Sequence, residues 1–434
     1  MHKPIALTIL AAGLACLLLV GCQAKDEEII EEGSFKSLLK LTASDAADSD
    51  SYGLTVSVDG DLALVGAPGA DGAGTDQGEA YLYQRTQGGT DGWGQIKTLF
   101  AGDAADGDYF GVSVSVSGDY AVIGAVGENG SGTDQGAAYV FYRNQGGTDN
   151  WGQVRKIAAS DKADSDGFGF SVSIDGATII VGADGEDGAG TDRGAAYIFG
   201  KDQGGVDNWG QVAKIVSADP ADSDAFGYSV AVAGDLAVVG VPMEDGDGTD
   251  RGAAYVFARD LGGLEAWGLV KRLEAGTPSD SALFGNSVAV EGSLAVVGAG
   301  WEDGGGTDRG AAYLFSRDEG GADLWGQIKQ LAASDRSDGD FFGYSVSLNG
   351  DNVVIGASRA EGGGTERGQA YVFSKDEGGV DTWGEAQRLR ASDGANDDRF
   401  GGSTAISGSY ILVGATGEDG AGLDRGAAYM FKKI

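Results

Sequence analysis

Carboxylates are the side chains of this sequence that could do chemistry. The 434 residues include 66 Asp and Glu against 30 Lys and Arg, and the single histidine is His2. With no histidine in the body of the chain, Ser-His-Asp and Cys-His nucleophilic sites and histidine-ligated zinc are excluded. A carboxylate pair could still hydrolyse a glycoside. Most acidic positions recur along the chain, however, whereas a catalytic pair should occur once. We therefore expect no enzyme, and the alternative is a secreted carbohydrate-active enzyme that uses Asp or Glu.

Two acidic clusters recur at fixed places, each within a glycine-rich segment. One copy of them comprises Asp161, Asp164 and Asp166, followed by Glu186, Asp187 and Asp192. Oxygen ligands held by such loops suit calcium, which takes six to eight oxygens at about 2.3–2.6 Å. The alternative is local: the Asp side chains cap turns, and Asp192 forms a charge pair with Arg193. Both interpretations stay open, because no single loop matches a known metal spacing. Calcium is the one cofactor for which we find candidate ligands.

The clusters belong to a repeat of 58 residues that runs through the chain without insertion or deletion. Its marker is an aromatic residue followed by glycine. The seven pairs are Tyr52-Gly53, Phe110-Gly111, Phe168-Gly169, Phe226-Gly227, Phe284-Gly285, Phe342-Gly343 and Phe400-Gly401. A fixed period of this length indicates units that stack or close into a ring.

Each repeat contains four stretches with the pattern of strands. In the second repeat these are residues 112–116, where serine and valine alternate, then 120–125, 137–142 and 153–158. Alternation of apolar and polar residues is typical of a strand with one buried face, and no segment calls for a helix. Four antiparallel strands in each of seven units predict an all-β fold, a seven-bladed β-propeller.

The two ends of the repetitive body predict how the ring closes. Residues 35–41 match the fourth strand of a repeat, whereas residues 428–431, near the end of the chain, match the third. We expect the N-terminal strand to complete the last blade, because this pairing removes a sheet edge that would otherwise be exposed. In such a propeller the loop from the fourth strand to the next first strand opens on the same face as the loop from the second strand to the third. The two acidic clusters should therefore lie near each other on that face.

The repeat resembles the FG-GAP repeat, the unit of the integrin α-subunit propeller and of many bacterial surface proteins. Tyr52-Gly53 stands in the FG place and Gly66-Ala67-Pro68 in the GAP place, and the resemblance covers residues 35–434. Integrin-like members also carry a calcium loop of the pattern Asp-x-Asp-x-Asp-Gly between the first two strands. Asp59-Gly60-Asp61 is too short for that loop, so the resemblance does not carry calcium to those positions.

The N-terminus resembles that of a bacterial lipoprotein. Basic Lys3 precedes an apolar run that is too short to span a membrane comfortably, and the run ends in Leu19-Val20-Gly21-Cys22, which is similar to a lipobox. The resemblance implies a signal peptide over residues 1–21, a lipid on Cys22 and display at the outer membrane or cell surface of a bacterium. The alternative is an ordinary signal peptide. Residues 22–34 are then an acidic tether, and residues 35–434 form the propeller.

Net charge limits the partners. The formal charge of −36 repels DNA, RNA and anionic membrane at long range, so we expect contact with a membrane only through the lipid anchor. A protein or a glycan remains as the partner, and we expect a monomer.

One loop position singles out a candidate partner site. Four repeats have glycine there, at Gly69, Gly127, Gly185 and Gly417, whereas three successive repeats have Met243, Trp301 and Arg359. Large side chains of these kinds are enriched in binding sites, so we predict that these three bind a partner. Drift at a loop tip is the alternative. The tryptophans that precede the fourth strands, such as Trp151, should instead be wedges between blades, because large aromatic residues contribute mostly by burial.

Overall fold

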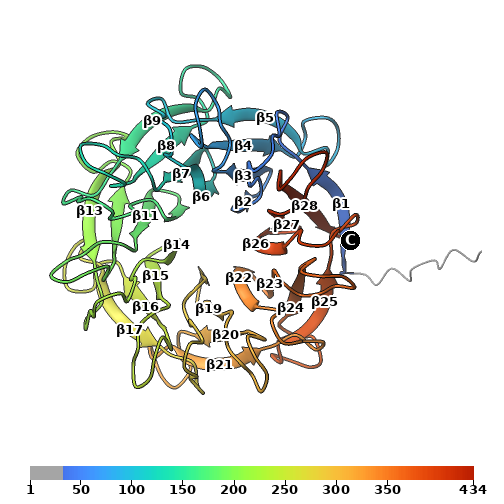
Figure 1. Ribbon diagram of the computed structural model, residues 1–434. Coiled ribbons are helices and arrows are strands. Elements are labelled where there is room, and N and C mark those ends of the chain that lie inside the picture. The colour runs from blue at the N-terminus through green and yellow to red at the C-terminus, as the bar shows by residue number, and fades with distance from the viewer. Residues whose placement is uncertain (1–32) are drawn as a thin grey trace, which may run out of the picture.

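Twenty-eight strands and no helix make up residues 33–434, the part of the chain that the computed structural model describes. The strands form seven four-stranded antiparallel sheets arranged around a central opening (Figure 1). The predicted all-β, seven-bladed propeller is therefore confirmed. The predicted signal peptide, Cys22 and nearly all of the predicted tether lie outside the described residues. Within those residues, no helix is long and apolar enough to cross a membrane.

Each blade runs from a strand at the opening to a strand at the periphery. The first strands are β2 (Val56–Asp59), β6 (Phe110–Ser117), β10 (Ser171–Asp175), β14 (Ser229–Ala233), β18 (Val288–Glu291), β22 (Phe342–Asn349) and β26 (Phe400–Ser407). The second strands are β3 (Leu62–Ala67), β7 (Tyr120–Ala125), β11 (Thr178–Ala183), β15 (Leu236–Val241), β19 (Leu294–Ala299), β23 (Asn352–Ala357) and β27 (Tyr410–Ala415).

The third and fourth strands complete each sheet. The third strands are β4 (Glu79–Gln84), β8 (Ala137–Tyr142), β12 (Ala195–Gly200), β16 (Ala253–Ala258), β20 (Ala311–Ser316), β24 (Gln369–Ser374) and β28 (Ala427–Lys433). The fourth strands are β5 (Gly94–Leu99), β9 (Gly152–Ile157), β13 (Gly210–Ile215), β17 (Gly268–Leu273), β21 (Gly326–Leu331), β25 (Gly384–Leu389) and, in the last blade, β1 (Phe35–Leu41). Blade 1 is β2–β5, and the numbering follows the chain to blade 7, which contains β26, β27, β28 and β1.

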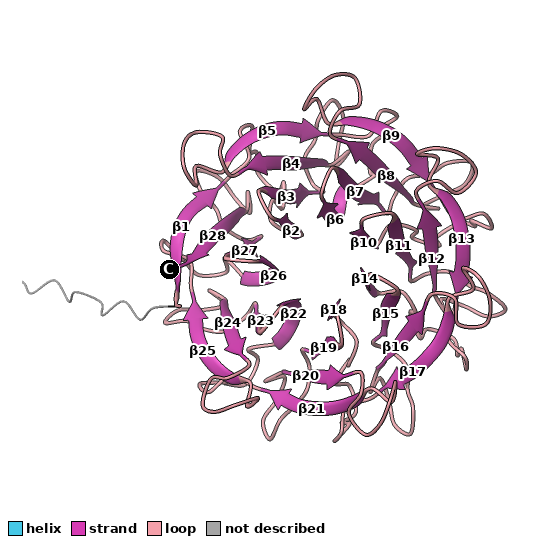
Figure 2. Cartoon of the chain, turned by 180° about the vertical axis from the view of Figure 1, so that it is seen from behind, coloured by secondary structure: helices cyan, strands magenta, loops and turns pink. Residues whose placement is uncertain are grey.

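The N-terminal strand closes the ring as the sequence predicts. β1 pairs antiparallel with β28, from Phe35 opposite Lys433 to Leu41 opposite Ala428. β1 lies at the rim, and β28 lies beside it, one strand further in (Figure 2). The ladder has a register shift between Ser37 and Leu39, and the third and fourth strands of the other six blades show a shift too. The split blade therefore has the geometry of the continuous ones.

The apolar core lies between neighbouring blades. Second and third strands are buried on both faces because each sheet is covered by the next, as shown by β7, whose six residues are all buried. Trp209 of blade 3 is 1% exposed and packs edge-on against Tyr120 of blade 2. Trp93 of blade 1 packs in the same way on Tyr410 of blade 7. The tryptophans are thus wedges between blades, as predicted, including at the seam where the ring closes.

Hydrogen bonds beside the central opening tie each blade to the next. A side chain at the start of each first strand donates to the glycine carbonyl of the following aromatic-glycine pair, as Ser113 Oγ does to Gly169 O at 2.7 Å. The other donors are Thr55, Ser171, Ser229, Asn286, Ser345 and Ser403. The bond from Ser403 to Gly53 crosses the seam at 2.9 Å, so all seven interfaces are joined in the same way.

Candidate functional site

Two kinds of loop form one face of the ring, which we call the acidic face: the loops between the fourth strand and the next first strand, and the loops between the second and third strands. They interlock across neighbouring blades. Asp164, in the loop that enters blade 3, accepts a hydrogen bond from Thr133 N of blade 2 at 3.0 Å. Asp222, in the next entry loop, pairs with Arg193 Nε of blade 3 at 2.8 Å. The predicted pair of Asp192 with Arg193 is therefore wrong, because Arg193 reaches across to the next blade.

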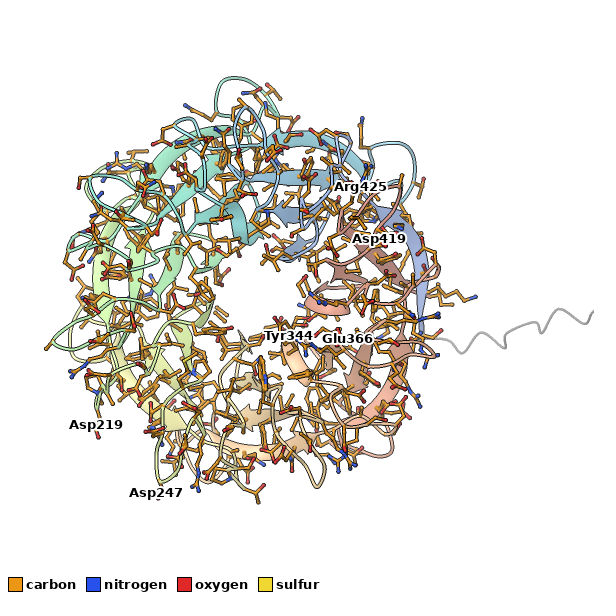
Figure 3. All side chains as sticks on the ribbon, in the orientation of Figure 1. Asp219, Asp247, Tyr344, Glu366, Asp419 and Arg425 are labelled. Atoms are coloured by element: carbon orange, nitrogen blue, oxygen red, sulfur yellow. The ribbon has the colours of Figure 1, made fainter. Side chains whose placement is uncertain are left out.

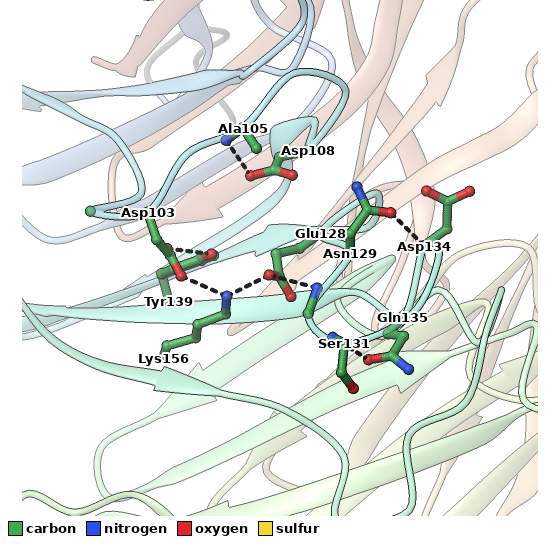
Figure 4. Close-up of polar contacts among 12 residues, drawn as sticks. Asp103, Ala105, Asp108, Glu128, Asn129, Ser131, Asp134, Gln135, Tyr139 and Lys156 are labelled. Carbon is green, nitrogen blue, oxygen red and sulfur yellow. Dashed lines mark hydrogen bonds and ion pairs between the residues drawn. The ribbon is translucent and has the colours of Figure 1, made fainter.

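A lysine stands at the centre of the acidic cluster in several blades. In blade 2, Lys156 Nζ lies 2.7 Å from both Asp103 Oδ2 and Glu128 Oε1, and the hydroxyl of Tyr139 donates to Asp103 (Figure 4). Burial lowers the pKa of Lys156, but its two carboxylate partners outweigh that effect and the net pKa is raised. The ammonium thus provides a positive charge beside the largely buried carboxylate of Glu128 and also pairs with the more exposed Asp103.

The six residues predicted as calcium ligands do not converge on one point. Asp161 and Glu186 share Lys214 at 2.7 and 2.8 Å. Three of the other four side chains accept backbone N–H groups: Asp164 from Thr133, Asp166 from Ala163 and Asp187 from Asp192, whose own carboxylate lines a separate cavity. In residues 33–434, no group of three or more His, Cys, Asp and Glu is placed to hold a metal ion. As arranged, these residues do not fit calcium, because a lysine takes the position between the two closest carboxylates.

Charge balance across the repeat supports this assignment. Blades 2, 3 and 7 each combine an Asp, a Glu and a Lys. In blade 7 these are Asp393, Glu418 and Lys40. Blade 5 has Gln330 in place of the lysine, and there Thr277 replaces the aspartate. One carboxylate is thus missing where the cation is missing. Blades 2, 3, 5 and 7 thus follow the pattern of an internal ion cluster, whereas blade 6 keeps its cation, Arg388, with Ala360 in place of the glutamate.

A third aspartate in this region is buried in six of the seven blades. Asp166 is 2% exposed, and its Oδ2 accepts the N–H of Ala163 at 2.6 Å. Burial raises the pKa of its carboxyl, and the neighbouring Glu186 adds to the effect. These residues cap the turns that lead into the first strands, which is the local role that the sequence left open.

The predicted partner residues fall on the acidic face but form two groups. Trp301 packs on Phe341, with ring centroids 5.2 Å apart, and the guanidinium of Arg359 lies over the same ring at 4.7 Å. Tyr344 extends this cluster toward the central opening (Figure 3). We call Trp301, Phe341, Tyr344 and Arg359 the aromatic cluster. Met243, which is 40% exposed, belongs to a separate cavity.

That cavity has a volume of about 630 Å³ and spans blades 2 to 4. Tyr109, Val126 and Met243 form its apolar part, and Asp134, Asp184 and Asp192 supply carboxylates. Asp184 is half-buried, and burial raises the pKa of its carboxyl to about 6, with a contribution from the charge of Asp192. The lining of this cavity contains no Lys or Arg.

Sequence reasoning missed Asp184 although a signal was present. The residues at its position in the other blades are Pro68, Val126, Pro242, Gly300, Ser358 and Thr416, so it is the one carboxylate among seven. A comparison of every repeat position, and not of the glycine position alone, would have found it. The same comparison would have found Phe341 and Tyr344.

The fold and this face together define the class of the protein: a closed seven-bladed propeller with one elaborated loop face. Its sequence matches the FG-GAP repeat family over seven segments, residues 36–83, 93–141, 151–199, 209–257, 267–315, 325–373 and 383–431. The chain therefore belongs to the FG-GAP repeat family.

Among solved structures, a chain from the "Crystal Structure of Mitotic Checkpoint Complex" is similar with a TM-score of 0.54 and 11% identity, covering 98% of this chain and 99% of that chain. At this identity the likeness concerns the fold alone. No curated protein matches the chain.

Proposed function

We propose that this protein is a lipid-anchored bacterial surface protein that acts as a non-enzymatic binding or adhesion module through its acidic face. The observation that carries the proposal is the placement of the residues that break the repeat. Trp301, Arg359 and Met243 replace glycine in three successive blades, and all three belong to one face. A scaffold alone has no need of large side chains that are partly or fully exposed at loop tips, whereas binding sites are enriched in them.

A propeller suits this role because its face is rigid. Each loop is held by a sheet behind it and by the next loop beside it, as in the pair of Asp222 with Arg193. Preorganised loops lose little conformational freedom on binding, so more of the contact energy remains as affinity. The net charge of −36 disfavours polyanions and leaves a protein or a glycan as the partner.

The binding half of the proposal is tested by retention of partners on the full-length protein in detergent. We would present it with a saccharide array and with outer-surface extracts, and compare the parent with Trp301→Gly, which installs the residue that four other blades carry. Specific binding that weakens in the variant supports the proposal. Binding that is the same in parent and variant places the site elsewhere, and no binding at all refutes a binding module.

The anchor half rests on Leu19-Val20-Gly21-Cys22. Cys22→Ser should abolish labelling by a lipid precursor and move the protein from the membrane fraction to the soluble fraction. A parent protein that carries no label and fractionates like the variant would show an ordinary signal peptide. Calcium binding stays a separate prediction, which is tested by melting the protein with calcium and with chelator.

A further inference from the structure

Two residues that depart from the repeat, Trp301 and Asn286, meet two residues from variable positions, Phe341 and Tyr344, at one point between blades 5 and 6. Position by position, Trp301 stands where most blades have glycine, and Phe341 stands where the others have Ser51, Tyr109, Gly167, Ala225, Leu283 and Arg399. Tyr344 and Asn286 share a position that holds Leu54, Val112, Phe170, Tyr228 and Gly402 elsewhere. Trp301 contacts the rings of both Phe341 and Tyr344, and Asn286 hydrogen-bonds the backbone of Tyr344, so the four residues form one connected group.

Their contacts build a platform with a floor and an open surface. Phe341 is 8% exposed and lies beneath Trp301, at 5.2 Å between ring centroids and 80° between planes. Tyr344 lies 5.8 Å from Trp301 at 45° and is 40% exposed. The edge-to-face pair of Trp301 with Phe341 is stabilised by about 0.5–1.5 kcal/mol beyond burial, and the tilted ring of Tyr344 packs beside it. Trp301 and Tyr344 are therefore held in place while part of their surface faces solvent.

Asn286 fixes the platform from below. It is buried, and its Nδ2 donates to Tyr344 O at 2.9 Å as well as to Gly343 O, while its Oδ1 accepts the N–H of Gly300 at 3.0 Å. In the other six blades, a hydroxyl makes only the bond to the glycine carbonyl. The carboxamide thus ties the residue before Trp301 to the backbone of Tyr344. Such support of binding residues by a second layer is the feature that preorganises a site.

Polar groups with unused hydrogen-bonding capacity border the platform. Arg359 and Arg399 both face Glu366, but their Nε atoms lie 4.0 and 3.8 Å from its oxygens, and both arginine side chains are about half exposed. An arginine presents five N–H donors in a planar fork, so most of these donors remain available to a ligand. Glu366 adds acceptors beside the central opening (Figure 3).

We infer that the aromatic cluster binds a neutral saccharide, an inference that rests on the proposed binding function and names its ligand class. A pyranose ring has an apolar face of C–H groups and an edge of hydroxyl groups. The exposed rings of Trp301 and Tyr344 match the apolar face, and Arg359 with Glu366 supplies donors and acceptors for the hydroxyl edge. The net charge of −36 repels an acidic polysaccharide. A protein partner needs about 800 Å² on each side, whereas the platform offers two partly exposed rings.

The tryptophan count makes this inference directly testable. Six of the seven tryptophans are buried wedges, and Trp301 is the one on the acidic face. Titration of the full-length protein in detergent with neutral oligosaccharides selected on an array should therefore change the fluorescence of Trp301. Loss of a central aromatic anchor commonly weakens binding about thirtyfold or more, so we expect that loss for Trp301→Gly, and about tenfold for Tyr344→Val, the residue of blade 2.

The matched control is Leu264→Ala. Leu264 is 88% exposed and lies in the loop between β16 and β17, on the opposite face, so its removal should change affinity less than twofold. Unfolding curves of each variant verify that the fold is intact. Asn286→Leu, the residue of blade 1, tests positioning: it should weaken binding while leaving Trp301 present.

The outcomes separate this inference from the proposed function. A neutral saccharide that binds the parent and loses affinity in Trp301→Gly supports both. A saccharide that binds the variant equally well overturns the platform. If no saccharide binds but a protein partner does and requires Trp301, the binding function stands and the saccharide inference fails. If nothing binds the folded parent, both fail.

Discussion

Gly426→Ala measures directly whether the ring is closed in solution. Gly426 of blade 7 forms a parallel bridge with Tyr52 of blade 1, at the seam. Its φ is +81°, and a Cβ there would lie 1.9 Å from Tyr52 O and 2.7 Å from its C and N atoms. Tyr52 is completely buried, so the backbone of blade 1 has little room to retreat.

The expected cost has two parts. A left-handed conformation costs an alanine about 1–2 kcal/mol, and forcing an extra methyl group into a packed interface typically costs about 1–3 kcal/mol more. We therefore expect Gly426→Ala to lower the free energy of unfolding by about 3 kcal/mol. Gly60→Ala supplies the control for the first part, because Gly60 has a φ of +56° but a Cβ there meets nothing within 4 Å. That variant should lose about 1–2 kcal/mol.

Gly194→Ala supplies the control for the second part. Gly194 bridges Phe226 at an interface within the continuous chain, with a φ of +77° and a Cβ that would lie 2.2 Å from Phe226 O. Unfolding in guanidinium chloride, followed by the fluorescence of the buried tryptophans, compares all three variants. In a closed ring, Gly426→Ala and Gly194→Ala destabilise equally. A seam that is open in solution would give Gly426→Ala the small effect of Gly60→Ala while Gly194→Ala keeps the large one.

Three further predictions concern β1, Asp184 and Lys156. Removing residues 33–41 deletes buried Phe35 and Leu41. At about 3 kcal/mol for each large apolar side chain, this should lower the free energy of unfolding by more than about 5 kcal/mol, whereas removing residues 23–32 should not. Equal melting temperatures of the two truncated proteins would contradict closure by β1. Burial raises the pKa of Asp184 to about 6 in the folded protein, compared with about 4 in the unfolded chain. Ionisation of Asp184 therefore lowers the free energy of unfolding as pH rises from about 4 to 6, and Asp184→Asn should stabilise the fold by about 2–3 kcal/mol at pH 8. The gain should vanish below pH 4, and a gain that does not depend on pH would refute this origin. For calcium, Lys156→Gln frees Asp103 and Glu128 from their cation and should increase the stabilisation that calcium provides. At a hundredfold excess over the dissociation constant, calcium should raise the free energy of unfolding by up to about 2.7 kcal/mol. If neither calcium nor chelator changes the melting temperature of the parent or of the variant, a functional site is excluded.

Strand order and ring closure could be predicted because they depend on local pattern. The apolar runs at 120–125 and 137–142 predicted β7 and β8 with their observed bounds. The first strand was predicted as 112–116 and extends over Phe110–Ser117 in β6, because Phe110 pairs with Ala125 across a register shift that alternation does not reveal. The match of residues 35–41 to a fourth strand was enough to predict the seam.

By itself, the sequence determined the number of blades, the strand order, the buried tryptophan wedges and which loops share a face, since each of these repeats with a period of 58 residues. The tertiary structure decided which side chains meet on that face. Lys156 reaches Asp103 across 53 residues, and Asn286 reaches Tyr344 across 58. These contacts depend on the twist between blades and on the direction of each side chain, which no local pattern encodes. For that reason the carboxylates expected around calcium surround a lysine, and Met243 lies with Asp184 and not with Trp301.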